Sequence, residues 1–306
     1  MELANQLSRE GFSNQLRVAT RGDVGALTRL LQTAVYCHLH VDWYLPVDWI
    51  GSPGFVVYPK LALTRLNHAA KFIGQREEVL GCLVAASDVM PAAWMRVAAL
   101  ADMPQPRMAL LAMANRVELY LRQRKVEQLA WLIMNSWPQT WLEEMGFFLV
   151  NEIETYVKKD TAMPLITSSP NLQIRPVHAD DFDALARLEA AAYEPLWQHS
   201  AHALHLARPQ SFSFDVALLH NEIAGFQLSS RTDAGVHLAR LTVNPIYQGY
   251  GVGSALLVHA LSSYHQHGLH TVSLNTQIDN LPSQALYKKF GFQASGARLP
   301  VWLKEL

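Results

Sequence analysis

The fold of the second half of the chain is decided by one stretch, NPIYQGYGVGSALL at residues 244–257. An alternating run at residues 236–243 precedes it and predicts a strand, which ends at Pro245 because proline cannot donate a hydrogen bond to a sheet. An apolar stripe at helical spacing follows and predicts a helix over residues 254–267. Glycines between a strand and a helix let the backbone approach a ligand closely, and amides at a helix N-terminus favour an anion. The stretch therefore predicts a phosphate-binding turn.

Glycine turns also occur in other nucleotide-binding proteins and as plain tight turns. Dinucleotide- and methyl-donor-binding folds place the loop directly after its strand and end the following strand on an acidic residue. Here residues 244–247 separate the strand from the loop, and the following strand ends at Thr276 with no acid before Asp279. The P-loop pattern GxxxxGKS/T is absent. The choice between an anion site and a plain turn therefore depends on the flanking sequence.

The flanking sequence alternates strands and helices. Residues 172–177 predict a first strand, and helices are expected directly after it and within residues 195–207. Further strands are expected at residues 211–219, 223–230, 236–243 and 271–276. Pro282 and Gly291 bound another helix, and a last pair of strands is expected within residues 292–306.

Together these features resemble the GNAT superfamily of N-acyltransferases. The superfamily pattern, Q/R-x-x-G-x-G/A between the fourth strand and the third helix, is matched by Gln248, Gly251 and Gly253. The helical segment NLPSQALYKKFGF at residues 280–292 is a second point of likeness, and two motifs at the right separation are more specific than one. The resemblance covers residues 172–306. It implies an α/β (α+β) fold, with a mixed, mainly antiparallel twisted sheet flanked by helices.

The resemblance also implies acetyl-CoA as the co-substrate, with no metal. Main-chain amides of the glycine turn would hold the pyrophosphate, and the edge of the preceding strand would pair with the pantetheine arm. The cofactor-binding residues implied in this way are Leu241, Thr242, Val243, Gln248, Gly249, Tyr250, Gly251, Val252, Gly253, Ser254, Asn280, Ser283 and Tyr287.

Tyr287 matches the position that in the superfamily commonly protonates the departing CoA thiolate. The chemistry is reasonable, because a thiolate of pKa ~8.5 needs a nearby proton donor and a phenol of pKa ~10 can supply one. A tyrosine on a helix face can equally be a packing residue. With the motif around it, Tyr287 is the predicted catalytic residue.

The general base is not identified by the sequence. An alkylammonium acceptor of pKa ~10 must lose a proton before its nitrogen can attack a thioester. His237 lies near the start of the central strand, where some members of the superfamily have a carboxylate, but it is not an exact match. The region that usually lines the acceptor pocket in the superfamily contains Glu189, Tyr193, Glu194 and His199. Each is more often a surface or packing residue than a base, and a chain of water molecules is an alternative.

The first half repeats the same order more loosely, which indicates an internal duplication. EEMGFF around Gly146 parallels KKFGFQ around Gly291. With these glycines aligned, Leu142 takes the position of Tyr287, and MPQPRM at residues 103–108 takes that of the glycine turn. Leucine cannot donate a proton and proline has no N–H. We therefore expect a degenerate copy that serves structure or acceptor recognition.

A proline-containing polar segment, KKDTAMPLITSSPN at residues 158–171, separates the two halves. The expected organisation is a degenerate GNAT-like domain at residues 1–162, a linker at 163–170 and a GNAT acetyltransferase domain at 171–306. A length of 306 residues agrees with two domains of about 150 residues each.

Composition excludes several other classes of protein. The formal net charge is -1, from 25 basic and 26 acidic residues, which offers no broad positive field for nucleic acid. Two cysteines give neither a disulfide framework nor a Cys-rich zinc site, and the histidines at 199, 202 and 205 drift out of phase around a helix. No apolar run approaches the ~18 residues of a membrane-spanning helix, and the N-terminus lacks a secretory pattern. A cytoplasmic protein with no metal or membrane partner is expected, and its oligomeric state is not indicated.

The expected function is transfer of an acetyl group from acetyl-CoA to a primary amine, by direct attack in a ternary complex. The acceptor would be a small-molecule or peptide amine, whose identity the sequence does not specify. The alternative is an acyl-CoA-binding regulatory or scaffold protein with little transferase activity, which the lack of an obvious base favours. An enzyme that binds a methyl donor or a dinucleotide is disfavoured by the position of the glycine turn.

Overall fold

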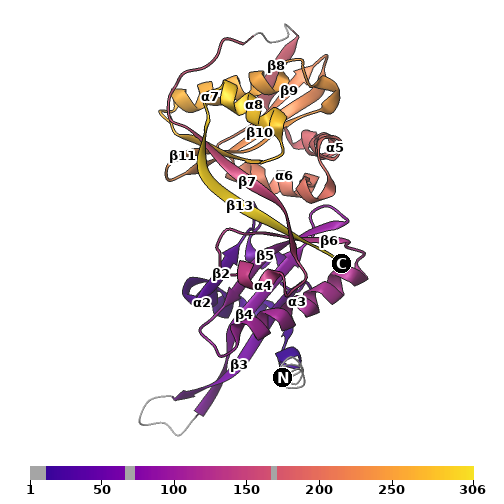
Figure 1. Cartoon of the computed structure of the whole chain (residues 1–306), viewed down its shortest axis with the longest axis vertical. Coiled ribbons are helices and arrows are strands. Elements are labelled where there is room, and N and C mark those ends of the chain that lie inside the picture. The colour runs from indigo at the N-terminus through magenta and orange to yellow at the C-terminus, as the bar shows by residue number, and fades with distance from the viewer. Residues whose placement is uncertain (1–11, 66–72, 167–170) are drawn as a thin grey trace. The chain divides into compact units, whose positions relative to one another are not determined.

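The computed structural model describes residues 12–65, 73–166 and 171–306. The chain forms two compact units, the first made of residues 1–149 with 302–306 and the second of residues 150–301. Each unit is a mixed, mainly antiparallel sheet with helices against it (Figure 1), as the sequence predicted.

The sheet of the second unit has the strand order β13-β7-β12-β11-β10-β9-β8. The strands are β7 (Phe148–Lys158), β8 (Leu172–Pro176), β9 (Ser213–Leu219), β10 (Glu222–Thr232), β11 (Gly235–Val243), β12 (Val272–Gln277) and β13 (Gln293–Glu305). The pairing of β11 with β12 is parallel, whereas β8–β9, β9–β10, β10–β11 and β7–β12 are antiparallel. The tight β9–β10 turn places His220 and Asn221 at positive φ, as a two-residue hairpin loop requires.

Four helices flank this sheet: α5 (Phe182–Ala192), α6 (Ala201–Ala207), α7 (Val252–Gln266) and α8 (Leu281–Lys289). A Cβ on Gly225 of β10 would meet Val252 and Leu256 of α7. The ring of the next residue, Phe226, contacts Phe214, which in turn contacts Phe182 of α5. Successive side chains of a strand point to opposite faces, so α5 and α7 cover opposite sides of the sheet.

The predicted helix at residues 195–207 is shorter in the structure. Residues 195–197 form a single 3₁₀ turn, and α6 begins at Ala201. The hydroxyl of Ser200 accepts a hydrogen bond from the N–H of Ala203 at 3.1 Å and caps the helix there. The cap sets the start of α6.

The last strand differs from the prediction. A pair of strands was expected within residues 292–306, but the structure has one strand of 13 residues, β13. A hairpin within residues 292–306 is not needed to pair with β12, because β7, from earlier in the chain, pairs with it. Lys158 of β7 lies opposite Val272 and Ile153 opposite Gln277. The end of β13 belongs to the first unit, where the N–H of Leu306 donates to the Glu127 carbonyl at 2.9 Å.

The two compact units therefore divide the chain differently from the expected linker at residues 163–170. The divisions fall after residue 149 and after residue 301, within β7 and within β13. The reason is the pairing of β7 with β12, which joins a strand that precedes the linker to the second unit.

The first unit has the strand order β1-β3-β4-β5-β6, and β2 also pairs with β5. Its strands are β1 (Arg17–Val18), β2 (Tyr36–Leu39), β3 (Phe55–Arg65), β4 (Ile73–Ala86), β5 (Ala92–Leu100) and β6 (Gln128–Leu132). Its helices are α2 (Val24–Thr33), α3 (Pro106–Gln123) and α4 (Gln139–Leu142). Helix α2 packs on a face that includes Phe55 and Val57, and α3 packs on the alternate residues Val56 and Tyr58.

The two units repeat one another in detail. Each parallel pair, β5–β6 and β11–β12, spans three residue pairs. Each preceding antiparallel pair has a bulge, which leaves Arg96 of β5 and Ala239 of β11 without an opposite residue. The carbonyl of Leu142 accepts from the N–H of Phe147 at 3.0 Å, as that of Tyr287 accepts from Phe292. These matches place Leu142 at the position of Tyr287, as the sequence predicted.

Candidate active site

A pocket of about 890 Å³ lies in the second unit, between the end of β11 and the N-terminal ends of α7 and α8. Its lining contains every predicted cofactor-binding residue except Thr242 and Tyr287. The residues that it brings together are Leu241, Val243, Gln248, Gly249, Tyr250, Gly251, Val252, Gly253, Ser254, Asn280 and Ser283.

The glycine turn presents unbonded amides to this pocket. Gly251 is the N-cap of α7, and its carbonyl accepts the first helical hydrogen bond, from Ala255 at 2.9 Å. The N–H groups of Gly249 and of residues 251–254 have no backbone acceptor among the described residues. Gly249 and Gly251 have φ of +85° and +80°, a conformation that side-chain-bearing residues rarely adopt. The turn therefore has the donors and the backbone shape of an anion site.

One edge of β11 is open beside the turn. The parallel register of β11 with β12 runs only from Val236 to Leu238, so no described strand pairs with the edge from Ala239 to Val243 on that side. Leu241 and Val243 line the pocket. An unpaired edge can bind an extended chain through main-chain hydrogen bonds, as a neighbouring strand would.

In the first unit the equivalent edge is occupied. The bulges align Val97–Leu100 of β5 with Arg240–Val243 of β11. Along this part of β5, strand β2 pairs from Tyr36 opposite Leu100 to Leu39 opposite Val97. The first unit therefore has no open edge at the position where β11 has one.

Tyr287 is buried, with 6% of its surface exposed, and it does not line the pocket. Its ring contacts Phe292 and Tyr156 of β7. Burial, together with the nearby Tyr193, raises the pKa of the Tyr287 phenol above its usual value; Arg240 and a hydrogen bond with Ser283 act in the opposite direction. Ser283, which is on the same helix as Tyr287, lines the pocket. A phenol in this setting keeps its proton at neutral pH, as a proton donor must.

A buried ion pair, Arg240 with Glu189, lies next to Tyr193 of the pocket lining. Glu189 of α5 is 0% exposed and accepts hydrogen bonds from Arg240 Nε at 3.0 Å, Thr242 Oγ1 at 2.7 Å and the His199 N–H at 3.1 Å. The Arg240 guanidinium lies 4.0 Å from the ring centre of Tyr193, whose hydroxyl donates to the Leu241 carbonyl at 3.3 Å. Thr242 thus points away from the pocket, and Glu189 is used in structure rather than as an accessible base.

Of the five candidate bases, Tyr193 alone lines the pocket. His237 pairs with the Ser273 hydroxyl at 2.9 Å, and burial lowers the pKa of this histidine. Glu194 is exposed outside the lining, and His199 contributes its N–H to Glu189. Within residues 12–65, 73–166 and 171–306 there is no group of three or more potential metal ligands.

The sequence did not indicate Lys289, an exposed cation of the pocket lining at the end of α8. Lysines are common in the last turn of any helix, so its type and position carried no specific signal. Tyr247 was also missed; it lines the pocket and its hydroxyl donates to Glu222 at 2.7 Å.

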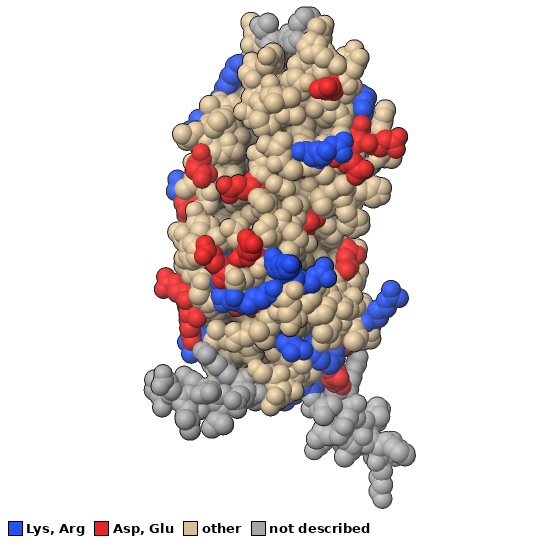
Figure 2. Space-filling model, turned by 90° about the vertical axis from the view of Figure 1, so that its right-hand side faces the viewer, with Lys and Arg blue, Asp and Glu red and all other residues tan. Residues whose placement is uncertain are grey.

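On the face drawn in Figure 2, basic and acidic side chains are interspersed. No described helix is long and apolar enough to cross a membrane.

We expect Gly251→Leu to weaken acetyl-CoA binding by at least about 10-fold, because a side chain at φ +80° strains the turn and moves the amides that face the pocket. Gly268→Leu is the matched control. Gly268 lies beyond the other end of α7 at φ +73°, with nothing within 4 Å of an added Cβ. Both variants carry similar backbone strain, so calorimetry that shows equal losses of affinity would contradict a role for the turn.

The model of the acetyltransferase (GNAT) family matches residues 182–292 of this chain. A Bacillus subtilis protein named as an N-acetyltransferase of ribosomal protein bS18 alanine is 24% identical over 125 residues, which are 41% of this chain and 83% of that protein. Mycothiol acetyltransferase of an Arthrobacter species is 44% identical over 50 residues, 16% of each chain.

Solved structures share the fold over nearly the whole chain. A GCN5-related N-acetyltransferase from Sphaerobacter thermophilus is 16% identical with a TM-score of 0.58, covering 95% of each chain. A tandem GNAT protein from the clavulanic acid biosynthesis pathway is 15% identical with a TM-score of 0.58, covering 95% of this chain and 98% of that one. The GNAT-like fold therefore extends over both units.

Proposed function

We propose that this acyltransferase, whose residues 182–292 are a GNAT-family domain, moves an acetyl group from acetyl-CoA to a primary amine. One observation carries the proposal: the unbonded amides of the glycine turn and the open edge of β11 face the same pocket. A diphosphate at the turn and an extended pantetheine arm along the edge would satisfy both sets of main-chain groups.

Two groups of the second unit act on the thioester, a main-chain N–H of β11 and the hydroxyl of Tyr287. A main-chain N–H of residues 241–243 holds the thioester oxygen as it becomes negative, where a preorganised donor lowers the barrier by about 3 kcal/mol. The amine nitrogen forms a bond to the acetyl carbon, and its surplus proton leaves to water. The C–S bond breaks, Tyr287 gives its proton to the sulfur, and the resulting phenolate takes a proton back from water. The attack is direct, so acetyl-CoA and the amine are bound together.

The first unit is proposed to be a degenerate copy that serves structure or acceptor recognition. Helix α3 begins with Gln105 as the N-cap and Pro106 as the first helical residue, where α7 has Gly251 and Val252. Pro106 removes one amide from the helix start. Strand β2 occupies the edge of β5, and Leu142 stands in place of Tyr287. Titration with acetyl-CoA should accordingly give one molecule per chain, and two would contradict this proposal.

Thiol release tests the transferase directly. The protein is incubated with acetyl-CoA and a panel of small-molecule and peptide amines, and we expect free CoA to appear only when a suitable amine is present. Binding of acetyl-CoA without amine-dependent release would instead favour the acyl-CoA-binding regulatory or scaffold protein, which the scarcity of candidate bases at the pocket supports. Acetyl-CoA at 100 times its Kd should stabilise the protein by about 2.7 kcal/mol, whereas S-adenosylmethionine and NAD should not.

A further inference from the structure

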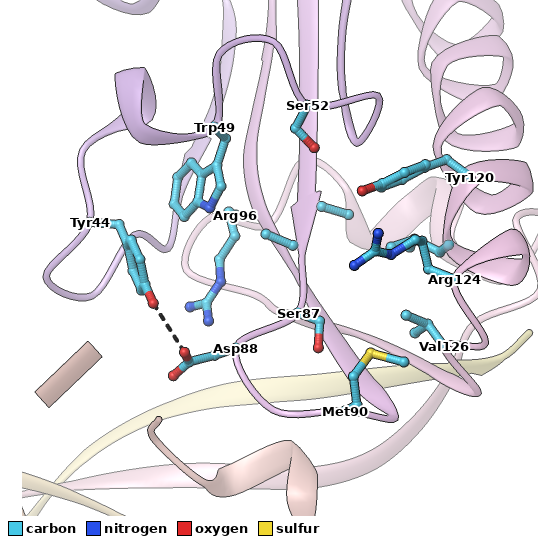
Figure 3. A pocket seen from close by; sticks show the side chains of 13 residues that line it. Tyr44, Trp49, Ser52, Ser87, Asp88, Met90, Arg96, Tyr120, Arg124 and Val126 are labelled. Atoms are coloured by element: carbon cyan, nitrogen blue, oxygen red, sulfur yellow. Dashed lines mark hydrogen bonds between the residues drawn. The ribbon is translucent and has the colours of Figure 1, made fainter. Parts of the chain in front are cut away.

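A second, smaller pocket lies wholly within the first unit. It has a volume of about 210 Å³ and lies beside the C-terminal end of α3, the opposite end of that helix from Gln105 (Figure 3). Its walls come from the β2–β3 loop, the end of β4 with the β4–β5 connection, Arg96 of β5, and the end of α3 with the residues that follow it. The lining has three aromatic rings, two serines and three charged groups: Tyr44, Trp49, Tyr120, Ser52, Ser87, Asp88, Arg96 and Arg124.

Arg96 is a buried cation with an unused donor. It is 3% exposed and occupies the bulge of β5, the position of Ala239 in the second unit. Its Nη1 forms an ion pair with Asp42 and donates to the His40 carbonyl at 3.4 Å. Its Nε is buried and has no hydrogen-bond partner among the described residues. An arginine side chain buried with a free N–H is costly unless a ligand accepts from it.

Two further residues with donor groups line the same pocket. The Ser87 hydroxyl is buried and also has no partner among the described residues. Arg124, exposed at the C-cap of α3, extends its guanidinium toward the pocket from the side opposite Arg96 (Figure 3). Arg124 has no salt bridge within the described part of the chain. Arg96, Ser87 and Arg124 therefore all line one small cavity, and two of them are charged.

The charges and the rings define the ligand. A carboxylate has two acceptor oxygens in one plane, which match the planar donor groups of arginine. Asp88, whose carboxylate accepts from the Tyr44 hydroxyl at 3.0 Å, also lines the pocket and disfavours a dianion such as phosphate. The rings of Tyr44, Trp49 and Tyr120 offer flat apolar surface for the rest of the molecule. We propose that the first unit binds a small aromatic monocarboxylate in this pocket.

Benzoate is a suitable probe, and benzamide is its uncharged counterpart of the same shape. Calorimetry on the full chain is expected to show one benzoate bound per chain and at least about 10-fold weaker binding of benzamide. Arg124→Gln should weaken benzoate binding by about 10-fold, because it removes a charged donor and, being exposed, should leave the fold intact. Arg122→Gln is the matched control, since Arg122 is exposed on the same helix but outside the lining.

Saturation with CoA separates this pocket from that of the second unit. We expect benzoate to bind equally well to the CoA-saturated protein, and Ser87→Ala to weaken it several-fold. Absence of benzoate binding, displacement of benzoate by CoA, or equal affinity of the wild type and Arg124→Gln would each overturn the proposal. None of these outcomes bears on acetyl transfer by the second unit, which the amine-dependent release of CoA measures separately.

Discussion

Replacing Tyr287 with phenylalanine is expected to slow acetyl transfer by about 100-fold while acetyl-CoA still binds. The substitution removes only the hydroxyl and keeps the ring, so its contacts with Tyr156 and Phe292 remain. The turnover number at saturating substrates and the affinity measured by calorimetry separate the two effects. Tyr264→Phe is the matched control, because Tyr264 is buried in the same core but lies on α7, whereas Tyr287 lies on α8 and is hydrogen-bonded to Ser283 of the pocket lining.

The pH dependence gives a second view of the same group. Burial raises the pKa of Tyr287, so the phenol keeps its proton at every pH below its ordinary value of about 10. Loss of the Tyr287 proton should therefore cause no fall in turnover between pH 7 and about 10. The protonation state of Tyr287 should not change below neutral pH, so it should cause no rise in turnover there. Unchanged turnover in Tyr287→Phe would assign the proton to another donor.

Replacing Glu189 with alanine is expected to destabilise the second unit by about 3–5 kcal/mol. The change leaves Arg240, whose side chain is 15% exposed, without its partner, and it removes the acceptor of Thr242 and of the His199 N–H. A buried charge that loses its partner keeps the cost of desolvation and gains no attraction in return. Chemical unfolding of the full chain, followed by probes in the second unit, measures the loss.

An exposed ion pair of the same unit provides the control for Glu189. Glu152 pairs with Arg298 at 3.0 Å, with side-chain exposures of 28% and 52%. Glu152→Ala should cost no more than about 1 kcal/mol, because solvent screens exposed pairs. Equal losses of unfolding free energy in the two alanine variants would show that the buried Arg240–Glu189 pair stabilises the unit no more than an exposed pair does. Replacement of Glu189 and Arg240 together by apolar residues should recover much of the stability, as removal of both charges avoids an unpaired one.

The two units differ in strand pairing, because the edge of β5 is paired with another strand and the corresponding edge of β11 is open. Both strands have the same bulge and the same short parallel pairing. Among the described strands, β2 lies along the remaining edge of β5, and none lies along that of β11. Strand β2 was not predicted, because four residues, YCHL, are too short for an alternating pattern to stand out. The proposal that one unit binds acetyl-CoA and the other does not therefore gains support from topology that the sequence did not reveal.

The sequence by itself determined the features that depend on neighbours along the chain. Glycine and proline lie at the helix starts: α7 begins at Val252 directly after Gly251, two residues before its predicted start at 254, and α3 begins at Pro106. Regular spacing of apolar residues placed most strands and helices of residues 171–306, including α5 with its buried Phe182. The amides of the glycine turn follow from the same local rules, since the first residues of a helix have no acceptor within it. Eleven of the thirteen residues implied to hold the cofactor accordingly line one pocket.

The tertiary structure alone decided which distant segments became neighbours. An alternating pattern says that a segment is a strand but not which edge it will pair with, so the pairing of β7 with β12 and the single strand β13 could not be foreseen. The contact between Arg240 and Glu189 joins residues 51 positions apart, and the burial of Tyr287 depends on Tyr156 from before the linker. Such contacts form because sheet edges and buried charges must be satisfied somewhere in the folded chain, and only the closed fold determines where.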